Sequence, residues 1–364
     1  MQHNQITPVA KNRYAFADGL RGLAALWVVF YHLLHGSHVQ LLTEYIGSGL
    51  SAIFFEYGNL GVPIFFVLSG FVMAVTTNNK NMGGLQSSRF MLRRLIRISP
   101  PYYFGILISL ILLYVKIHTV DSTIQFPDIA NIIAHLLYLQ GYFQLTPINI
   151  VFWTLCYEIQ FYLVFSIVIY LASRVQSSTF NYDTVLIAAT LPGLLWLTFA
   201  EYAPSWQAYA SNHLLFIHYW YAFSAGALIG WLMNKPQGVF FRNYTVLFYT
   251  VLIVIGALKH DLFALTAGLA AVAMQIAIHR NKMNSWLNFK PIQILGLISY
   301  SLYLIHNNLL GIVARIIRKF LSPGILTDIT VASVATLACL VAAFLMYQFI
   351  EKPVIKLSQR IKYS

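Results

Sequence analysis

Apolar segments of membrane-spanning length recur along the whole chain, and short polar stretches that hold most of the charges separate them. An α-helix needs about 20 apolar residues, with a range of roughly 17 to 25, to cross the hydrocarbon core of a bilayer. Read against this length, the pattern predicts about ten membrane-spanning helices. They fall at residues 20–35, 59–77, 100–116, 150–172, 184–200, 212–233, 243–258, 262–279, 293–314 and 328–349.

The composition excludes an ordinary soluble domain. Of 364 residues, 59% are apolar and only 9% are charged, and the mean hydropathy is +0.68. We therefore expect an all-α membrane protein with a single membrane domain over residues 1–364, including a polar N-terminal segment, 1–17, and a C-terminal tail, 350–364. The first apolar run contains Arg21 and has no small-residue cleavage site, so we interpret it as a retained helix.

The basic residues predict the orientation. With the N-terminus in the cytoplasm, the cytoplasmic segments hold 18 of the 23 Lys and Arg residues, which places both termini inside by the positive-inside rule. The net charge of +12 would favour nucleic acid in a soluble protein. Here the cations flank spans, so we expect contacts with membrane lipid and no nucleic acid partner. One loop disagrees, because Arg315, Arg318 and Lys319 fall outside.

Four ionisable residues stand out inside the predicted spans: Arg21, His32, Glu158 and His306. Such groups are costly in a membrane unless they face a cavity or a partner, so each is a candidate functional residue, with a structural hydrogen bond between helices as the alternative. Eleven positions separate Arg21 from His32, which is three helical rotations plus roughly 20° and about 16 Å along the axis. Both side chains are therefore expected on one helix face.

Depth along the helices adds to this pattern. Glu158 lies about 12 Å below the outer surface and His306 about thirteen residues into its own helix, so both are predicted near the level of His32. Three titratable groups at one depth predict a reaction centre. Small residues inside the spans, among them Ser69, Gly70 and Gly226, predict close helix packing instead.

A basic segment precedes the third span. Arg89, Arg93 and Arg97 are spaced at i, i+4 and i+8 on one helix face, and Arg94 adjoins them. This stripe has two interpretations that are compatible. It is a topology anchor in contact with headgroups, or its guanidinium groups bind phosphate.

Several motifs together resemble the bacterial acyltransferase-3 family of integral membrane O-acyltransferases. Among them are Phe65-Phe-Val-Leu-Ser-Gly-Phe71 and Trp153-Thr-Leu-Cys-Tyr-Glu158. Each is weak alone, but their order along nearly the full length is specific. The matching segments are 18–32, 65–71, 89–101, 152–162, 297–306 and 351–353.

This resemblance implies a function, and two motifs of the family can be located in this sequence. The essential Arg, ten residues, then His arrangement of the family maps onto Arg21 and His32, and its Trp-Ser-Leu-x-x-Glu pattern ends here at Glu158, with Thr154 in place of Ser. The family implies transfer of an acyl group, usually acetyl from cytoplasmic acetyl-CoA, to a hydroxyl of a cell-surface or exported glycan, in the bacterial inner membrane. Some members carry an extracellular esterase-like domain, which we do not expect here because the chain ends at Ser364.

The resulting hypothesis assigns roles. His32 would act as general base or transient acyl acceptor, and Glu158 would orient it. The predicted acyl-CoA-binding residues are Arg21, Arg93, Arg94 and Arg97. Possible contacts to the acceptor or to the thioester carbonyl are Tyr300, His306 and Trp153.

Two alternatives remain open from the sequence. One is a transporter or flippase for a polymeric or lipid-linked sugar, because buried charges also mark translocation paths. The other is a non-catalytic membrane partner of a glycan synthase. Acetyl-CoA is expected as a substrate, with no permanently bound cofactor and no metal site. The acceptor, the acyl group and the oligomeric state are not specified by the sequence.

Overall fold

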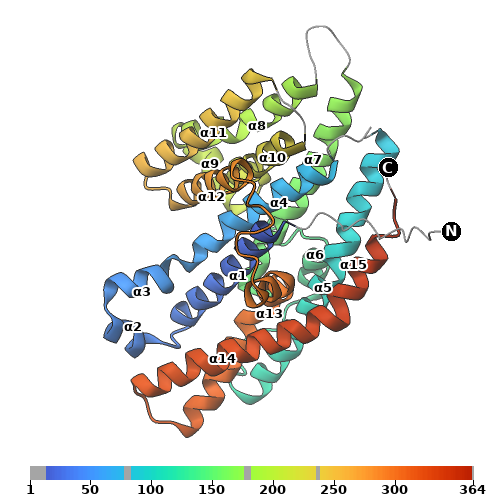
Figure 1. The fold of residues 1–364 in the computed structure, drawn as a ribbon. Helices are drawn as coiled ribbons and strands as arrows, with labels where there is room; N and C mark the ends of the chain where they lie inside the picture. Colours follow the sequence, from blue (N-terminus) through green and yellow to red (C-terminus); the bar gives the residue numbers. More distant parts are fainter. Residues whose placement is uncertain (1–13, 78–82, 176–181, 235–237, 363–364) are drawn as a thin grey trace, which may run out of the picture.

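The structure is a computed structural model that describes residues 14–77, 83–175, 182–234 and 238–362. These residues form helices and no strand. Ten long helices make up the body of the molecule (Figure 1). They are α1 (Ala15–His35), α4 (Gly61–Thr77), α5 (Gly84–Thr119), α7 (Trp153–Arg174), α8 (Tyr182–Phe199), α10 (Trp220–Asn234), α11 (Val239–Leu258), α12 (Leu262–His279), α13 (Lys290–Phe320) and α14 (Ile325–Met346).

Short helices connect or extend the long ones. They are α2 (Gln40–Ile46), α3 (Ser48–Phe54), η1 (Glu56–Leu60), α6 (Ile129–Leu136), η2 (Ile150–Phe152), η3 (Ala200–Tyr202), α9 (Pro204–Asn212), η4 (Phe216–Tyr219), η5 (Tyr347–Glu351) and α15 (Lys352–Ser358).

Every predicted span coincides with a helix. Within the described residues, eight helical stretches are long and apolar enough to cross a membrane, and α9 with the η4–α10 stretch forms a ninth that is bent by 99°. α1, which was predicted as the first span, is not in this set, because its 21 residues include the polar side chains of Asp18, Arg21, His32 and His35. The prediction of an all-helical, multi-pass membrane fold is confirmed.

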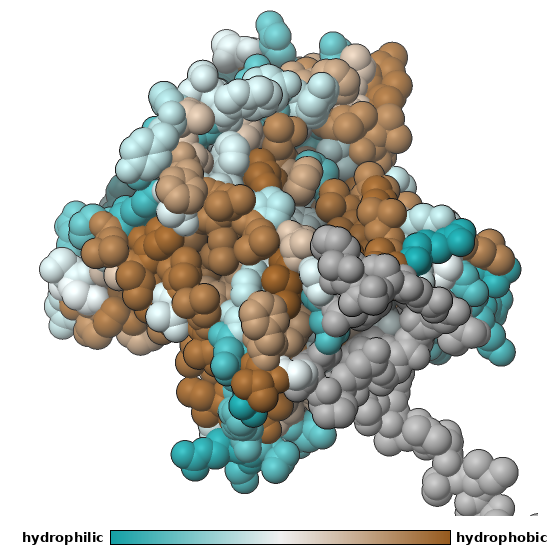
Figure 2. Space-filling view, turned by 90° about the horizontal axis from the view of Figure 1, so that it is seen from above, coloured by the Kyte–Doolittle hydropathy of each residue, from teal (hydrophilic) through white to brown (hydrophobic). Residues whose placement is uncertain are grey.

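The outer surface of the bundle is apolar. Figure 2 shows large hydrophobic areas on one face, with hydrophilic residues gathered towards its margins. Side chains on four different long helices are about half exposed, as expected where lipid replaces water. Examples are Leu107, Leu163, Val254 and Val341.

The helix that carries the arginine stripe is longer than predicted. α5 has 36 residues and so a length of about 54 Å, which exceeds the roughly 30 Å of a hydrocarbon core. The predicted span began at residue 100, because charged residues precede it. Pro100 and Pro101 lie inside the helix rather than at its start, and the arginines belong to the same continuous helix.

Close packing of α4 against α10 depends on glycine. A Cβ atom added at Gly70 would lie 1.9 Å from the carbonyl oxygen of Phe223, and one added at Gly226 would lie 1.8 Å from that of Val67. The two backbones therefore touch, as small residues allow in membrane proteins. The expectation from the sequence is confirmed at these positions.

A second glycine contact sets the relation between α1 and α13. A Cβ at Gly22 would lie 2.6 Å from the backbone nitrogen of Gly296. His32 follows Gly22 by ten residues, and His306 follows Gly296 by ten residues. Because the rise per residue is the same in both helices, this register brings the two imidazoles to one level.

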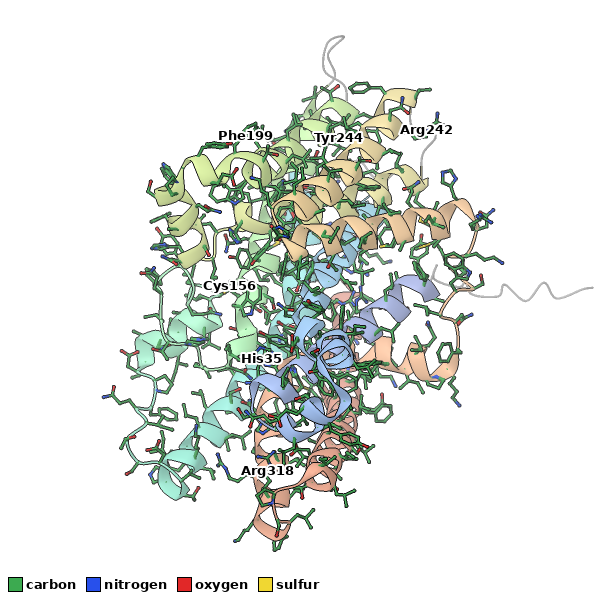
Figure 3. All side chains as sticks on the ribbon, turned by 90° about the vertical axis from the view of Figure 1, so that its left-hand side faces the viewer. His35, Cys156, Phe199, Arg242, Tyr244 and Arg318 are labelled. Atoms are coloured by element: carbon green, nitrogen blue, oxygen red, sulfur yellow. The ribbon has the colours of Figure 1, made fainter. Side chains whose placement is uncertain are left out.

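One cation of the basic loop that disagreed with the predicted orientation, Arg318, has a structural role. Arg318 at the end of α13 donates a hydrogen bond to Asp328 at 2.9 Å and another to the backbone oxygen of His38 at 3.0 Å. Asp328 also accepts from the backbone of Leu42 at 3.2 Å. Figure 3 labels Arg318 and His35 in the lower half of the view. Arg318 thus ties the α13–α14 connection to the α1–α2 connection.

Candidate active site

A cavity of about 210 Å³ lies between α1, α4, α5, α7, α13 and η5. It collects side chains from segments that are far apart in the sequence. Five of the predicted site residues line it: Arg21, Arg94, Arg97, Glu158 and Tyr300. This cavity is therefore the part of the molecule in which most of the predicted chemistry meets.

Two arginines of α5 reach the cavity, Arg94 and Arg97. They are three residues apart, which places them on one helix face. Arg94 is buried, donates to the hydroxyl of Thr76 at 2.8 Å and lies over the ring of Phe90. Arg93, which was predicted to join them, is not among the lining residues. Of the predicted row Arg89, Arg93 and Arg97, one member, Arg97, lines the cavity, together with the adjoining Arg94.

Carboxylates accompany these cations. Asp18 lies 3.6 Å from Arg21, and Glu351 accepts a hydrogen bond from Ser301 at 2.7 Å. Glu351 is only 4% exposed and belongs to η5, a π-helical turn, which is a feature often found at functional sites. Glu351 was not predicted as a site residue, although its position at the end of an apolar run was a usable signal. An anionic ligand would take the place of Asp18, Glu158 and Glu351 as the partner of these arginines.

Glu158 is held by two hydroxyl groups. Ser69 donates to its carboxylate at 2.9 Å, and Tyr162 donates to the same oxygen. The two hydroxyls are also 3.0 Å from one another. In the described residues His32 is not among the hydrogen-bond partners of Glu158. Ser69, expected only as a packing residue, therefore has a polar role, and Tyr162 could have been found because it lies one helical turn after Glu158.

His32 and His306 face each other, with ring centroids 5.0 Å apart. His306 is fully buried, and its Nδ1 lies 3.1 Å from the backbone oxygen of Leu302 and 2.9 Å from that of Tyr303. Carbonyl oxygens only accept hydrogen bonds, so Nδ1 carries the proton and Nε2 keeps its lone pair. In the described part of the chain this Nε2 has no hydrogen-bond partner.

Tyr303 lies between this histidine pair and the cavity. Neither imidazole is among the lining residues, whereas Tyr303 is, and its ring centroid lies 5.8 Å from that of His306. Its hydroxyl donates to the backbone oxygen of Val151 and accepts from Thr154, both at 3.0 Å. Arg21 thus lines the cavity and His32 does not, so the structure does not place the two side chains in one open cavity. Tyr303 was not predicted, although it lies one helical turn before His306.

The remaining predicted residues have different surroundings. Tyr300 lines the cavity, and its hydroxyl donates to the backbone oxygen of Ile98 at 2.9 Å. Trp153 lines a second cavity and packs edge-on against Tyr157. The structure therefore does not bring Trp153 together with Tyr300.

Comparison with known proteins adds the family. A model of the acyltransferase domain family matches residues 14–348, which is nearly the whole described chain. The chain belongs to this acyltransferase family. Its match includes both helices that carry the histidine pair and all segments that line the cavity up to residue 348. The sequence prediction of a membrane acyltransferase is confirmed at this level.

Individual relatives are distant. The putative membrane-bound transacylase BcsY of Komagataeibacter xylinus is 27% identical over 315 residues, covering 81% of this chain and 72% of that protein. Peptidoglycan O-acetyltransferase OatA of Listeria monocytogenes is 24% identical over 375 residues, covering 93% of this chain and 55% of that protein. O-acetyltransferase OatA of Staphylococcus aureus is 24% identical, with 93% and 57% covered.

The chain thus spans little more than half the length of the OatA proteins. No solved structure matches.

Proposed function

We propose that this acyltransferase moves an acyl group, most simply acetyl from acetyl-CoA, to a hydroxyl of a cell-surface or exported polysaccharide. The names of the OatA relatives, which are O-acetyltransferases, support acetyl and an oxygen acceptor. The excess of Lys and Arg in the segments next to Arg21 supports a cytoplasmic location for this side of the bundle, in the bacterial inner membrane.

The single observation that carries the proposal is the joint placement of Arg21, Arg94, Arg97 and Glu158 in one cavity, one side chain away from His32 and His306. Guanidinium groups are suited to phosphate, because their forked N–H donors match its oxygens. The phosphates of coenzyme A would replace carboxylate partners such as Asp18. Glu158 would accept hydrogen bonds from amide N–H groups of the pantetheine arm.

The volume of about 210 Å³ is too small for a whole coenzyme, since pockets for drug-sized ligands are roughly 300 to 1,000 Å³. The nucleotide part would therefore remain at the entrance, and only the pantetheine arm would enter. A movement of the Tyr303 ring would then give His32 access to the thioester.

The chemical step needs one base. A neutral His32 would take the proton of a sugar hydroxyl while that oxygen attacks the thioester carbonyl, forming the C–O bond. The C–S bond then breaks, and the thiolate of coenzyme A takes the proton back from the imidazolium. The unpartnered Nε2 of His306 would stabilise this imidazolium by accepting a hydrogen bond from it, with no charge of its own.

Glycan analysis tests the proposal. Surface polysaccharides of a strain that lacks the gene should have lost an O-acyl group that wild type restores and His32→Ala does not, at equal abundance of the protein in the membrane. Mass spectrometry would identify the acceptor and the acyl group in one measurement. A transporter would change the amount of exported glycan rather than its acylation, and a non-catalytic partner would keep its effect after His32→Ala. Either result contradicts the proposal.

A further inference from the structure

A second cavity, with a volume of about 370 Å³, lies beside the start of α7. Loop residues before η2 and the turn after α9 form its walls. Its polar lining consists of the amides Gln140, Gln144 and Asn212, next to the ring of Trp153. No lining residue in the described part of the chain has an ionisable side chain. This is a different chemistry from the first cavity, which holds three guanidinium groups.

Gln140 is the buried amide of this cavity. Its side chain is 3% exposed, and its Nε2 donates to the hydroxyl of Tyr102 at 3.4 Å. Its carbonyl Oε1 has no hydrogen-bond partner among the described residues. A buried acceptor without a donor is costly. This oxygen is itself buried, so a small rotation of the Gln140 amide would let it accept from a hydroxyl or N–H group of a ligand in the cavity, and such a ligand would be favoured.

The walls of this cavity are fixed by side chains from the neighbouring helices. Gln160 of α7 donates to the backbone oxygen of Leu214 at 2.8 Å and accepts from the backbone of Phe216 at 3.0 Å. Asn131 of α6 donates to the backbone oxygen of Thr146 at 3.1 Å. The loops are therefore held in place before any ligand binds, which lowers the entropic cost of binding.

Exposed aromatic rings lead away from the cavity along the surface. Their centroids are 5.9 Å apart from Trp206 to Tyr209, 4.0 Å from Tyr209 to His213, 5.9 Å from His213 to Tyr142 and 5.3 Å from Tyr142 to Phe143. Trp206 is 65% exposed and Tyr142 48%. The chain positions next to His213 and Tyr142 line the cavity itself. We call these five rings the aromatic track.

Consecutive residues at the junction of η2 and α7 line the two cavities. Phe152 and Trp153 line the second cavity, and Thr154 and Leu155 line the first. Figure 3 marks this part of α7 with Cys156. A ligand in the second cavity would therefore lie beside the same segment that lines the donor cavity, in which Thr154 donates to Tyr303.

We infer that the second cavity and the aromatic track bind the acceptor, as a neutral oligosaccharide chain. Amide groups exchange hydrogen bonds with sugar hydroxyls, and aromatic faces stack on the apolar faces of sugar rings. The absence of ionisable groups from the described lining favours a neutral sugar over a phosphorylated one. One sugar unit would occupy the cavity with a hydroxyl donating to Gln140, and further units would follow the track. This inference rests on the proposed function.

The test measures transfer to the acceptor separately from reaction of the donor. Purified protein would receive [¹⁴C]acetyl-CoA, with the glycan fraction from membranes of cells lacking the gene as the acceptor probe. Release of coenzyme A without glycan reports the donor side alone. Gln140→Leu and Tyr142→Ala should each lower transfer to glycan at least ten-fold and raise the glycan concentration needed for half-maximal rate, while release of coenzyme A without glycan stays within two-fold of wild type.

Gln275→Leu is the matched control, because the side-chain carbonyl of Gln275 on α12 is likewise buried and unpartnered among the described residues. It should transfer normally. Tyr142 is exposed, so Tyr142→Ala should fold even where Gln140→Leu does not. Unchanged transfer by Tyr142→Ala, or a lower amount of protein in the membrane with normal transfer per molecule, would overturn the inference and make the track a lipid-facing aromatic belt. Failure of the proposed function is distinguishable, since wild type would then label no glycan.

Discussion

The imidazole rings of His32 and His306 lie 5.0 Å apart, on two helices that touch at Gly22 and Gly296. Glycine is needed at these positions because a Cβ would collide with the facing backbone. The packing of α1 on α13 therefore sets the distance between the two rings. In the proposed mechanism, the Nε2 of His306, which has no partner among the described residues, would accept a hydrogen bond from His32 once His32 has taken up a proton.

The two histidines should act as one unit. His32→Ala is expected to lower acyl transfer by about 10²- to 10⁴-fold, the usual loss for a general base. His306→Ala should cause a smaller loss and shift the pH profile of the rate, because the imidazolium of His32 loses its acceptor. The double variant should be no slower than His32→Ala alone. Additive losses measured by transfer of labelled acetyl would contradict the coupling.

Arginines on the cavity face of α5 should govern donor affinity. Arg97→Met is expected to raise the KM for acetyl-CoA by roughly 10- to 100-fold, as the loss of a charged hydrogen bond predicts. Arg93→Met is the matched control, since Arg93 does not line the cavity. Its KM should remain near the wild-type value. Equal effects of both substitutions would favour a general attraction by the basic stripe over a defined phosphate site.

The negative charge of Glu158 should matter more for activity than either hydroxyl group that donates a hydrogen bond to it. Glu158→Gln keeps an acceptor for Ser69 and Tyr162 but loses the carboxylate, and we expect roughly a 10-fold or greater loss of kcat/KM for acetyl-CoA. Tyr162→Phe removes one donor and should lose only a few-fold. Thermal unfolding in detergent should show both variants folded. A Glu158→Gln enzyme with full activity would leave Glu158 with a structural role.

Arg318 should contribute stability rather than activity. Arg318→Met leaves the buried carboxylate of Asp328 without its cationic donor, and we expect a loss of about 1–3 kcal/mol, seen as a lower Tm in detergent. The nearby Arg315 is exposed, so Arg315→Met should keep the wild-type Tm. Activity per folded molecule should be unchanged in both. A normal Tm for Arg318→Met would show that the pair is too exposed to stabilise the fold.

The sequence predicted the helices well because each must be apolar over a bilayer's thickness, a constraint that leaves a strong pattern. It also selected His32, His306 and Glu158, since ionisable groups within spans are rare. The hydrogen-bond partners of these residues were harder to predict from the sequence. Ser69 is a small residue of the kind that allows close helix packing, and its contact with Glu158 depends on how α4 packs against α7.

The position of Arg93 shows the same limit. The spacing of Arg89, Arg93 and Arg97 defines a helix face, but which face meets the cavity is decided by the packing of α5 on its neighbours. Likewise, helix geometry predicts one face for Arg21 and His32, but it could not show that Tyr303 of α13 lines the cavity beside His306.

The most direct test of the account measures acetyl-CoA binding and turnover in one preparation of purified protein. Wild type should bind acetyl-CoA and release coenzyme A when the membrane glycan fraction is added. His32→Ala should bind acetyl-CoA with the wild-type Kd, and Arg21→Met should bind it at least ten-fold more weakly. Release of coenzyme A by His32→Ala should fall at least 10²-fold. Wild-type turnover by His32→Ala, or wild-type affinity in Arg21→Met, would contradict a donor that enters past Arg21 and reacts at His32.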